Sequence, residues 1–197
     1  MSFSDIDRSL TTNLVSHFYT LKTFLPYMTS SSSTTDSDAD STGAARGGTV
    51  VTISSVIGHT GAANLADYAA AKAGVTALHK SLAAELRQSH PHVRTVLVTP
   101  GQLSTPLFYG VQTPSAFLAP VVEPVDVAKA VIAAIDGGCN DAIGMPLYAR
   151  WIDWYNVLPV GLQALARRLA GIDVAMRTFV GREGVERSKA EGGIKAF

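Results

Sequence analysis

The 197 residues of this chain suffice for one ordinary domain with its own hydrophobic core. Its 16 basic and 16 acidic side chains balance, so no net charge draws the protein to nucleic acid or to an anionic membrane. The one cysteine, Cys139, cannot form an internal disulfide, and no spaced set of cysteines and histidines predicts a metal site. We therefore expect no nucleic-acid partner, no metal and a reducing compartment.

Nothing in the sequence has the layout of an export signal or a membrane span. Asp5, Asp7 and Arg8 lie where a signal peptide would become apolar. No apolar run approaches the roughly 18 residues that cross a bilayer. We expect a protein of the cytoplasm, or of the cytosolic face of a membrane such as the endoplasmic reticulum or a lipid droplet.

An amphipathic helix is the first element that the pattern predicts, over residues 4–28. Ser4 is a suitable N-cap, and Asp5 and Asp7 favour the first turn because carboxylates suit the positive end of the helix dipole. Apolar side chains recur every three or four positions, which places them on one face. They are Ile6, Leu10, Leu14, Phe18, Leu21 and Leu25.

Residues 29–47 contain almost nothing that could be buried, since Ser, Thr, Asp and Gly dominate them. Such a composition cannot offset the entropy lost on ordering, so we predict a disordered insertion inside the domain. A regulated phosphorylation loop is the alternative use of the same residues.

A buried strand, an alanine-rich helix and a second buried strand follow the insertion. The strands are predicted at residues 49–54 and 93–98, where β-branched side chains cluster, and the helix at residues 68–88. Strand, helix and strand in this order predict a right-handed parallel unit of an α/β fold. Ser54 is expected to pack, because alternation along the strand turns it away from Ser55.

Pro124 opens another helix, predicted over residues 123–135 and followed by a last strand at 142–147. Residues 148–170 are aromatic and apolar. They suit either a lid and closing helix over a substrate pocket or an interfacial helix in peripheral contact with a membrane. We favour the lid, with membrane contact as its companion hypothesis, and expect a flexible tail over residues 182–197.

Tyr68 and Lys72 are four positions apart, so their side chains share one helix face with Cβ atoms about 6 Å apart. The nearby ammonium is expected to stabilise a phenolate and to lower the pKa of Tyr68 from about 10. Such a tyrosine can give or take a proton at neutral pH. Ser55 lies at the end of the preceding strand, where ligands of open α/β sheets gather. Its hydroxyl can therefore hydrogen-bond a substrate oxygen.

The order of ISS, YAAAK and PGQLST resembles the motif set of the short-chain dehydrogenase/reductase family, and the resemblance covers roughly residues 5–180. Ser55, Tyr68 and Lys72 match the family's catalytic serine, tyrosine and lysine. Asn13 matches the asparagine that helps to hold a proton-relay water. The resemblance implies that Tyr68 is the acid/base, that Ser55 orients the reacting oxygen and that Lys72 grips a ribose.

The same resemblance implies a nicotinamide cofactor, NAD or NADP. The residues implied to bind it are Tyr68, Lys72, Pro100, Gly101, Leu103 and Thr105, the last four matching the family's PGxVxT turn. Leu103 departs mildly from the commoner valine or isoleucine. The glycine-rich TGxxxGxG turn, which receives the pyrophosphate in the family, has no counterpart here. Most of the dinucleotide pocket is therefore expected to be missing.

The expected fold class is α/β, the C-terminal part of a Rossmann-like doubly wound parallel sheet that lacks the first βαβ units. Residues 1–181 would form this partial domain, in which about 100 residues are absent by comparison with a whole one. The later motifs EPVDVAKAVIAAI and IGMP resemble the branch of the family that acts on retinoids, steroids and other lipophilic alcohols.

Two hypotheses on function remain open at this point. In the first, the chain is an NAD(P)-dependent oxidoreductase that interconverts a lipophilic alcohol and its carbonyl, with Asn13, Ser55, Tyr68 and Lys72 as its catalytic residues. In the second, it is a cofactor-free remnant that acts as a dimerisation module. The helices predicted near the N-terminus and around Tyr68 form the dimer bundle in the family, so a homo-oligomer is expected through them.

The remaining polar residues receive ordinary structural roles. Asp67 suits the first turn of its helix, where a carboxylate stabilises the positive end of the dipole. The histidines lack an acidic partner at a telling spacing, so we expect them in loops or on the surface. They are His59, His79, His90 and His92.

Overall fold

The structure is a computed structural model that describes residues 2–30, 47–105, 111, 119–138 and 141–173. Nearly all of the predicted insertion, Cys139 and the predicted tail at 182–197 lie outside these residues. Among the helices that the structure describes, none is both long enough and apolar enough to cross a membrane.

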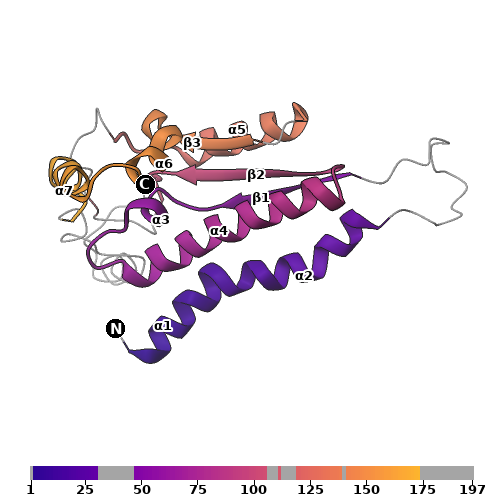
Figure 1. Ribbon diagram of the computed structural model, residues 1–197, viewed down its shortest axis with the longest axis horizontal. Helices are drawn as coiled ribbons and strands as arrows, with labels where there is room; N and C mark the ends of the chain where they lie inside the picture. The colour runs from indigo at the N-terminus through magenta and orange to yellow at the C-terminus, as the bar shows by residue number, and fades with distance from the viewer. Residues whose placement is uncertain (1, 31–46, 106–110, 112–118, 139–140, 174–197) are drawn as a thin grey trace, which may run out of the picture.

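Three parallel strands form the centre of the fold (Figure 1). They are β1 (Gly48–Ile53), β2 (Val93–Pro100) and β3 (Asp141–Met145), in the order β1-β2-β3. The register places Val96 of β2 beside Val51 of β1, and Val98 beside Ile143 of β3. The predicted parallel α/β arrangement is confirmed, and the carboxyl ends of all three strands meet at one edge.

Helices cover both faces of this sheet (Figure 1). On one face lies α4 (Ala66–Ser89), with α2 (Ser16–Thr29) beyond it, and on the other lies α5 (Pro124–Asp136). Successive side chains of β2 point to opposite faces of the sheet, so this strand packs against both helix layers. Val93 packs with Leu82 and Leu86 of α4. Val96 and Val98 pack with Val127 of α5.

The predicted N-terminal helix is interrupted by a π-turn. It consists of α1 (Phe3–Leu10), η1 (Thr11–Val15) and α2. The prediction of Ser4 as N-cap is wrong: Ser2 is the cap, and its hydroxyl accepts a bond from the Asp5 amide at 3.2 Å while the Asp5 carboxylate accepts one from the Ser2 amide at 2.9 Å. This reciprocal capping box begins the helix two residues earlier.

The remaining elements gather at the carboxyl edge of the sheet (Figure 1). They are α3 (Ile57–Thr60), η3 (Leu147–Trp151), α6 (Ile152–Tyr155) and α7 (Val160–Leu169). Parallel α/β sheets bind ligands at this edge. The region predicted as a lid therefore lies at the same end of the molecule as the candidate site.

The expectation of a loop or surface position for His79 is wrong, because this residue is buried between α4 and β1. Its Nδ1 lies 2.9 Å from the hydroxyl of Thr52. Burial lowers the pKa of His79 below its ordinary value of 6.5, and the charge of Lys80 lowers it further. Below pH 6.5 the unfolded chain therefore takes up a proton that the folded chain resists.

The free energy of unfolding is expected to be largest above pH 7 and to fall as the pH drops through 6.5 toward the lower pKa of the folded state. Urea midpoints of the wild type at pH 7.5 and pH 5.5, about one pH unit on either side of that value, measure the effect. His79→Gln replaces the imidazole with an amide that can still hydrogen-bond Thr52 and does not titrate, so the urea midpoint of this variant should change less with pH. The prediction would be contradicted if the urea midpoint of the wild type rose on acidification. It would also be contradicted if the midpoints of the wild type and of His79→Gln changed equally between the two pH values.

Candidate active site

Ser55 lies where β1 ends and the chain turns into α3. Its side chain is buried, and its hydroxyl accepts a bond from the Ile57 amide at 3.3 Å and donates to the Pro100 carbonyl at 3.5 Å. Ser54, one position before, faces α4, where its hydroxyl lies 2.7 Å from that of Thr76. The prediction that Ser54 packs is confirmed, and Ser55 is the serine that faces the carboxyl edge.

Tyr68 lies in the first turns of α4 with its hydroxyl hydrogen-bonded to Ser55. Burial raises the pKa of Tyr68 above its ordinary value of 10.0, and the hydrogen bond between Tyr68 and Ser55 opposes that rise. The prediction of a lowered pKa for Tyr68 is therefore wrong, because the loss of hydration on burial outweighs the influences that favour the phenolate. At neutral pH Tyr68 is a protonated phenol, which makes it a proton donor.

Lys72 ties α4 to the end of β1. Its Nζ donates to the Ile53 carbonyl at 3.0 Å and lies 5.8 Å from the centre of the Tyr68 ring. Burial lowers the pKa of Lys72. The lack of a side chain at Gly58 lets α3 lie close to α4, since a Cβ there would come within 2.8 Å of the Lys72 backbone. Ser55, Tyr68 and Lys72, named from the sequence, thus meet at one strand end.

Asn13 lies in the π-turn that packs against α4, where Leu14 occupies the space that a side chain at Gly74 would need. The Asn13 amide donates to the Ser9 carbonyl at 2.9 Å, within its own helix. In the described contacts it bonds its own helix rather than the serine, tyrosine and lysine. Its role toward a proton-relay water stays a prediction.

His17, one turn after Asn13, is a residue that sequence reasoning missed. Burial lowers the pKa of His17, and the positive charge of Lys72 lowers it further, so the two side chains are near each other. The sequence could have indicated His17 through its spacing, because a residue four positions after Asn13 lies on the same helix face.

The turn after β2 lies against the serine. The amide of Val56 donates to the Pro100 carbonyl at 3.0 Å, and that of Gly101 donates to the Met145 carbonyl at 2.7 Å. Leu103 forms a bridge with Val122, and the Thr105 amide donates to the Leu103 carbonyl. These bonds hold Pro100, Gly101, Leu103 and Thr105 at the carboxyl edge.

These residues fit one end of a dinucleotide cofactor. An ammonium and a phenol at the carboxyl edge of parallel strands suit the polar ribose beside a nicotinamide. The ammonium bond to Ile53 uses one of its three N–H donors, so Lys72 keeps donors for a ribose. For the pyrophosphate, the 197-residue sequence contains no glycine-rich TGxxxGxG turn.

The expectation of a loop or surface position is also wrong for His59, which lies on α3. Its side chain is almost fully buried, with Nδ1 3.1 Å from a carboxylate oxygen of Asp153 on α6. Lys80 of α4 lies 3.3 Å from the same carboxylate. Burial lowers the pKa of His59 although Asp153 opposes the shift. This cluster joins the turn after Ser55 to the aromatic segment.

Comparison with known proteins agrees with this geometry. The family model for short chain dehydrogenases matches residues 1–114, more than half of the chain. The chain belongs to the short-chain dehydrogenase family. The match includes all of the serine, tyrosine, lysine and PGQLST positions described above.

Named relatives of this short-chain dehydrogenase are distant. "Uncharacterized oxidoreductase TDA5" of Saccharomyces cerevisiae is 34% identical over 64% of this chain and 39% of that protein. Human "Retinol dehydrogenase 10" is 27% identical over 96% of this chain and 53% of that protein. "Short-chain dehydrogenase/reductase family 16C member 6" of Bos taurus is 28% identical over 95% and 56%. The chain spans about half the length of these curated relatives, or less.

Solved structures share the fold. A short chain dehydrogenase from Burkholderia cenocepacia in complex with NADP aligns with a TM-score of 0.61 at 21% identity, over 83% of this chain and 60% of that one. A 3-oxoacyl-[acyl-carrier protein] reductase with bound NAD from Brucella melitensis aligns with a TM-score of 0.54 at 24% identity, over 74% and 52%.

Proposed function

We propose that this chain carries the proton-transfer site of an NAD(P)-dependent oxidoreductase that interconverts a lipophilic alcohol, retinoid-like or steroid-like, and its carbonyl. The observation that carries the proposal is the hydrogen bond between Tyr68 and Ser55, with the Lys72 ammonium fixed at the same strand end. Family membership and the similarity to retinol dehydrogenase 10 over 96% of the chain support it.

In carbonyl reduction, the protonated Tyr68 donates its phenolic proton to the carbonyl oxygen, and in oxidation it takes the proton back. The Ser55 hydroxyl orients that oxygen, because it already lies beside the phenol. A bound nicotinamide supplies or accepts the hydride. Lys72 holds the ribose, and its positive charge favours the phenolate that remains after proton donation.

We also propose that the chain corresponds to the C-terminal part of a doubly wound domain. The strand order β1-β2-β3, with parallel pairing throughout, supports this assignment. So does the 60% coverage of the Burkholderia cenocepacia structure. The glycine-rich turn for the pyrophosphate would then belong to the part of the domain that these residues do not contain.

Titration of NADH and NADPH into the protein, followed by their fluorescence, tests the proposal. We expect saturable binding that is weak because these residues lack the pyrophosphate turn, oxidation of the reduced cofactor on addition of retinaldehyde or a steroid ketone, and loss of binding in Lys72→Met. Lys22→Met, a change of an exposed lysine on α2, is the matched control and should behave as the wild type. Absence of binding to either cofactor together with absence of turnover would contradict the proposal.

An interaction module is the second candidate function, and one feature of α2 favours it. Aromatic side chains stand exposed along this helix, which is unusual for a helix without a partner. They are Phe18, Tyr19, Phe24 and Tyr27. A stable dimer in light scattering, broken by Phe24→Ser and formed without cofactor binding, would favour the module. A monomer would exclude it.

A further inference from the structure

The amphipathic helix α7 has its apolar stripe on the outside. Leu158 comes just before the helix, and Leu162, Leu165 and Leu169 follow within it at spacings of three and four, which places these three on one helix face. The four leucine side chains are 40, 51, 51 and 75% exposed. In an ordinary surface helix such a stripe faces the core.

The polar face of α7 holds the helix in this orientation. Arg167 donates to the backbone carbonyls of Thr60 and Gly61, at the end of α3, and pairs with Asp173. Its side chain is only 24% exposed. Because these bonds lie on the side opposite the leucines, the stripe cannot turn inward without breaking them.

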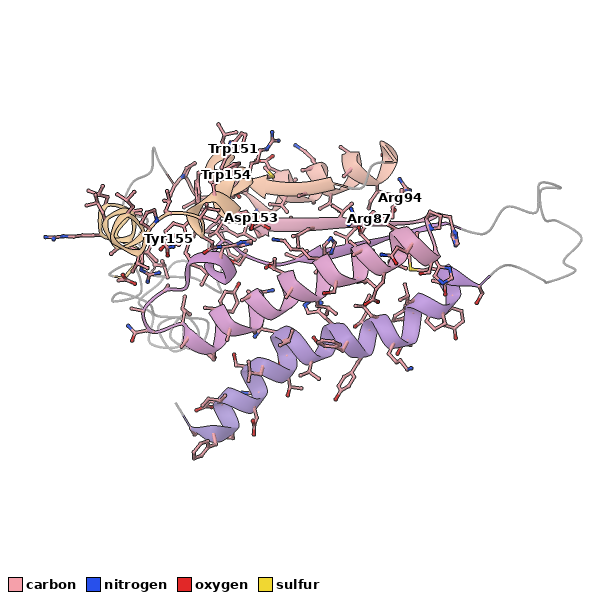
Figure 2. All side chains as sticks on the ribbon, viewed as in Figure 1. Arg87, Arg94, Trp151, Asp153, Trp154 and Tyr155 are labelled. Atoms are coloured by element: carbon pink, nitrogen blue, oxygen red, sulfur yellow. The ribbon has the colours of Figure 1, made fainter. Side chains whose placement is uncertain are left out.

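Two exposed tryptophans lie in the segment that precedes α7. Trp151 and Trp154 are 64 and 66% exposed. Figure 2 shows both beside Asp153 and Tyr155, on the segment that precedes α7. We call these exposed apolar residues together the tryptophan–leucine surface: Trp151, Trp154, Leu158, Leu162, Leu165 and Leu169.

The charge around the tryptophan–leucine surface is positive although the whole chain is neutral. Arg150 and Arg168, in the same segment of the chain, are exposed. The carboxylate of Asp153 is engaged by His59 and Lys80, and that of Asp173 by Arg167. Over the described residues 147–173 these are the two carboxylates, so this segment itself offers no free acid to the exposed arginines.

We propose that the tryptophan–leucine surface docks on an anionic lipid bilayer. Tryptophan at the headgroup level, leucine below it and arginine beside lipid phosphates is the arrangement of an interfacial helix. A second copy of the chain fits less well, because it would bring the same positive charge against the patch. Docking does not depend on catalysis, yet it places the turn after Ser55 near the bilayer, where a lipophilic substrate dissolves.

Intrinsic fluorescence tests this proposal directly, because the chain has two tryptophans and both belong to the surface. The full chain is titrated with vesicles of phosphatidylcholine containing phosphatidylserine, and with vesicles of phosphatidylcholine alone. We expect a blue shift of the emission, quenching by brominated acyl chains and co-flotation with the anionic vesicles. Binding to the neutral vesicles should be weaker.

Matched variants separate the surface from the rest of the molecule. Leu162→Ser and Leu165→Ser remove exposed side chains, and each should weaken vesicle binding by about ten-fold or more. Ile132→Ser changes an equally exposed side chain on α5 and should bind as the wild type. Arg168→Glu should weaken binding to the anionic vesicles more than to the neutral ones.

Three results would overturn docking on an anionic bilayer. The first is emission and flotation unchanged by vesicles, and the second is equal binding of the two lipid compositions. The third is a blue shift that grows with protein concentration in the absence of lipid, which would assign the surface to a second copy of the chain. Failure of the NADH titration above would leave each of these readouts unaffected, so the two proposals fail separately.

Discussion

Tyr68→Phe is expected to lower the rate of carbonyl reduction by roughly 100- to 10,000-fold, the usual contribution of a positioned acid. The change removes one O–H group, and with it the bond to Ser55, while the ring that lies against Lys72 remains. Folding and cofactor affinity should therefore stay close to those of the wild type. Single-turnover rates with NADH or NADPH and retinaldehyde measure the loss.

The control for this variant is Tyr27→Phe, on the exposed side of α2. It removes the same phenolic O–H at a position remote from the carboxyl edge, so its rate should equal that of the wild type. An unchanged rate in Tyr68→Phe would remove Tyr68 from the acid role, whatever its position beside Ser55.

Gly144→Ala is expected to cost about 3 kcal/mol of the free energy of unfolding. Gly144 is buried in β3, and a Cβ there would lie 2.5 Å from the carbonyl carbon of Ala149 and 2.7 Å from its oxygen. Both are backbone atoms of η3, which cannot rotate aside as the end of a flexible side chain can. For a domain of this size the melting temperature should fall by about 6 to 12 °C.

Gly161→Ala is the matched control, because a Cβ at Gly161 meets nothing within 4 Å. Gly161 lies in the first turn of α7, where alanine is the better helix former, so this variant should gain about 0.5 to 1 kcal/mol. Thermal and urea unfolding of both variants, beside the wild type, give the comparison. Equal stability of Gly144→Ala and the wild type would mean that η3 does not pack on β3 as closely as described.

The sequence was informative where local spacing decides the structure. Tyr68 and Lys72 share a helix face because four residues make about one turn. Ser55 lies beside them because a parallel unit returns every strand end to the same edge. The helix over residues 68–88 and the strands at 49–54 and 93–98 were predicted to within two residues at each end, because their apolar patterns are long and regular.

Features that depend on distant partners were not predictable in the same way. The direction of the pKa shift of Tyr68 depends on burial, which the i, i+4 spacing does not contain. His79 is buried because Thr52, on another element, offers it a hydroxyl, and His59 because Asp153 does the same with a carboxylate. Each partner is remote in sequence, so no short pattern joins the pairs.

The orientation of α7 likewise depends on a partner that is remote in sequence. Its spacing predicts an amphipathic helix, but the pattern does not say which face meets the protein. The bonds of Arg167 to Thr60 and Gly61 decide this, and they exist only in the folded chain.

The most direct test of the proton-transfer site follows the hydride that must accompany the proton. The wild type is given a lipophilic aldehyde or ketone and NADH or NADPH that carries deuterium at the transferable position of its nicotinamide ring. Mass spectrometry of the alcohol product should show deuterium on the carbinol carbon, with almost none formed by Tyr68→Phe. An alcohol free of deuterium, or equal incorporation in the two proteins, would contradict the site assigned to Ser55, Tyr68 and Lys72.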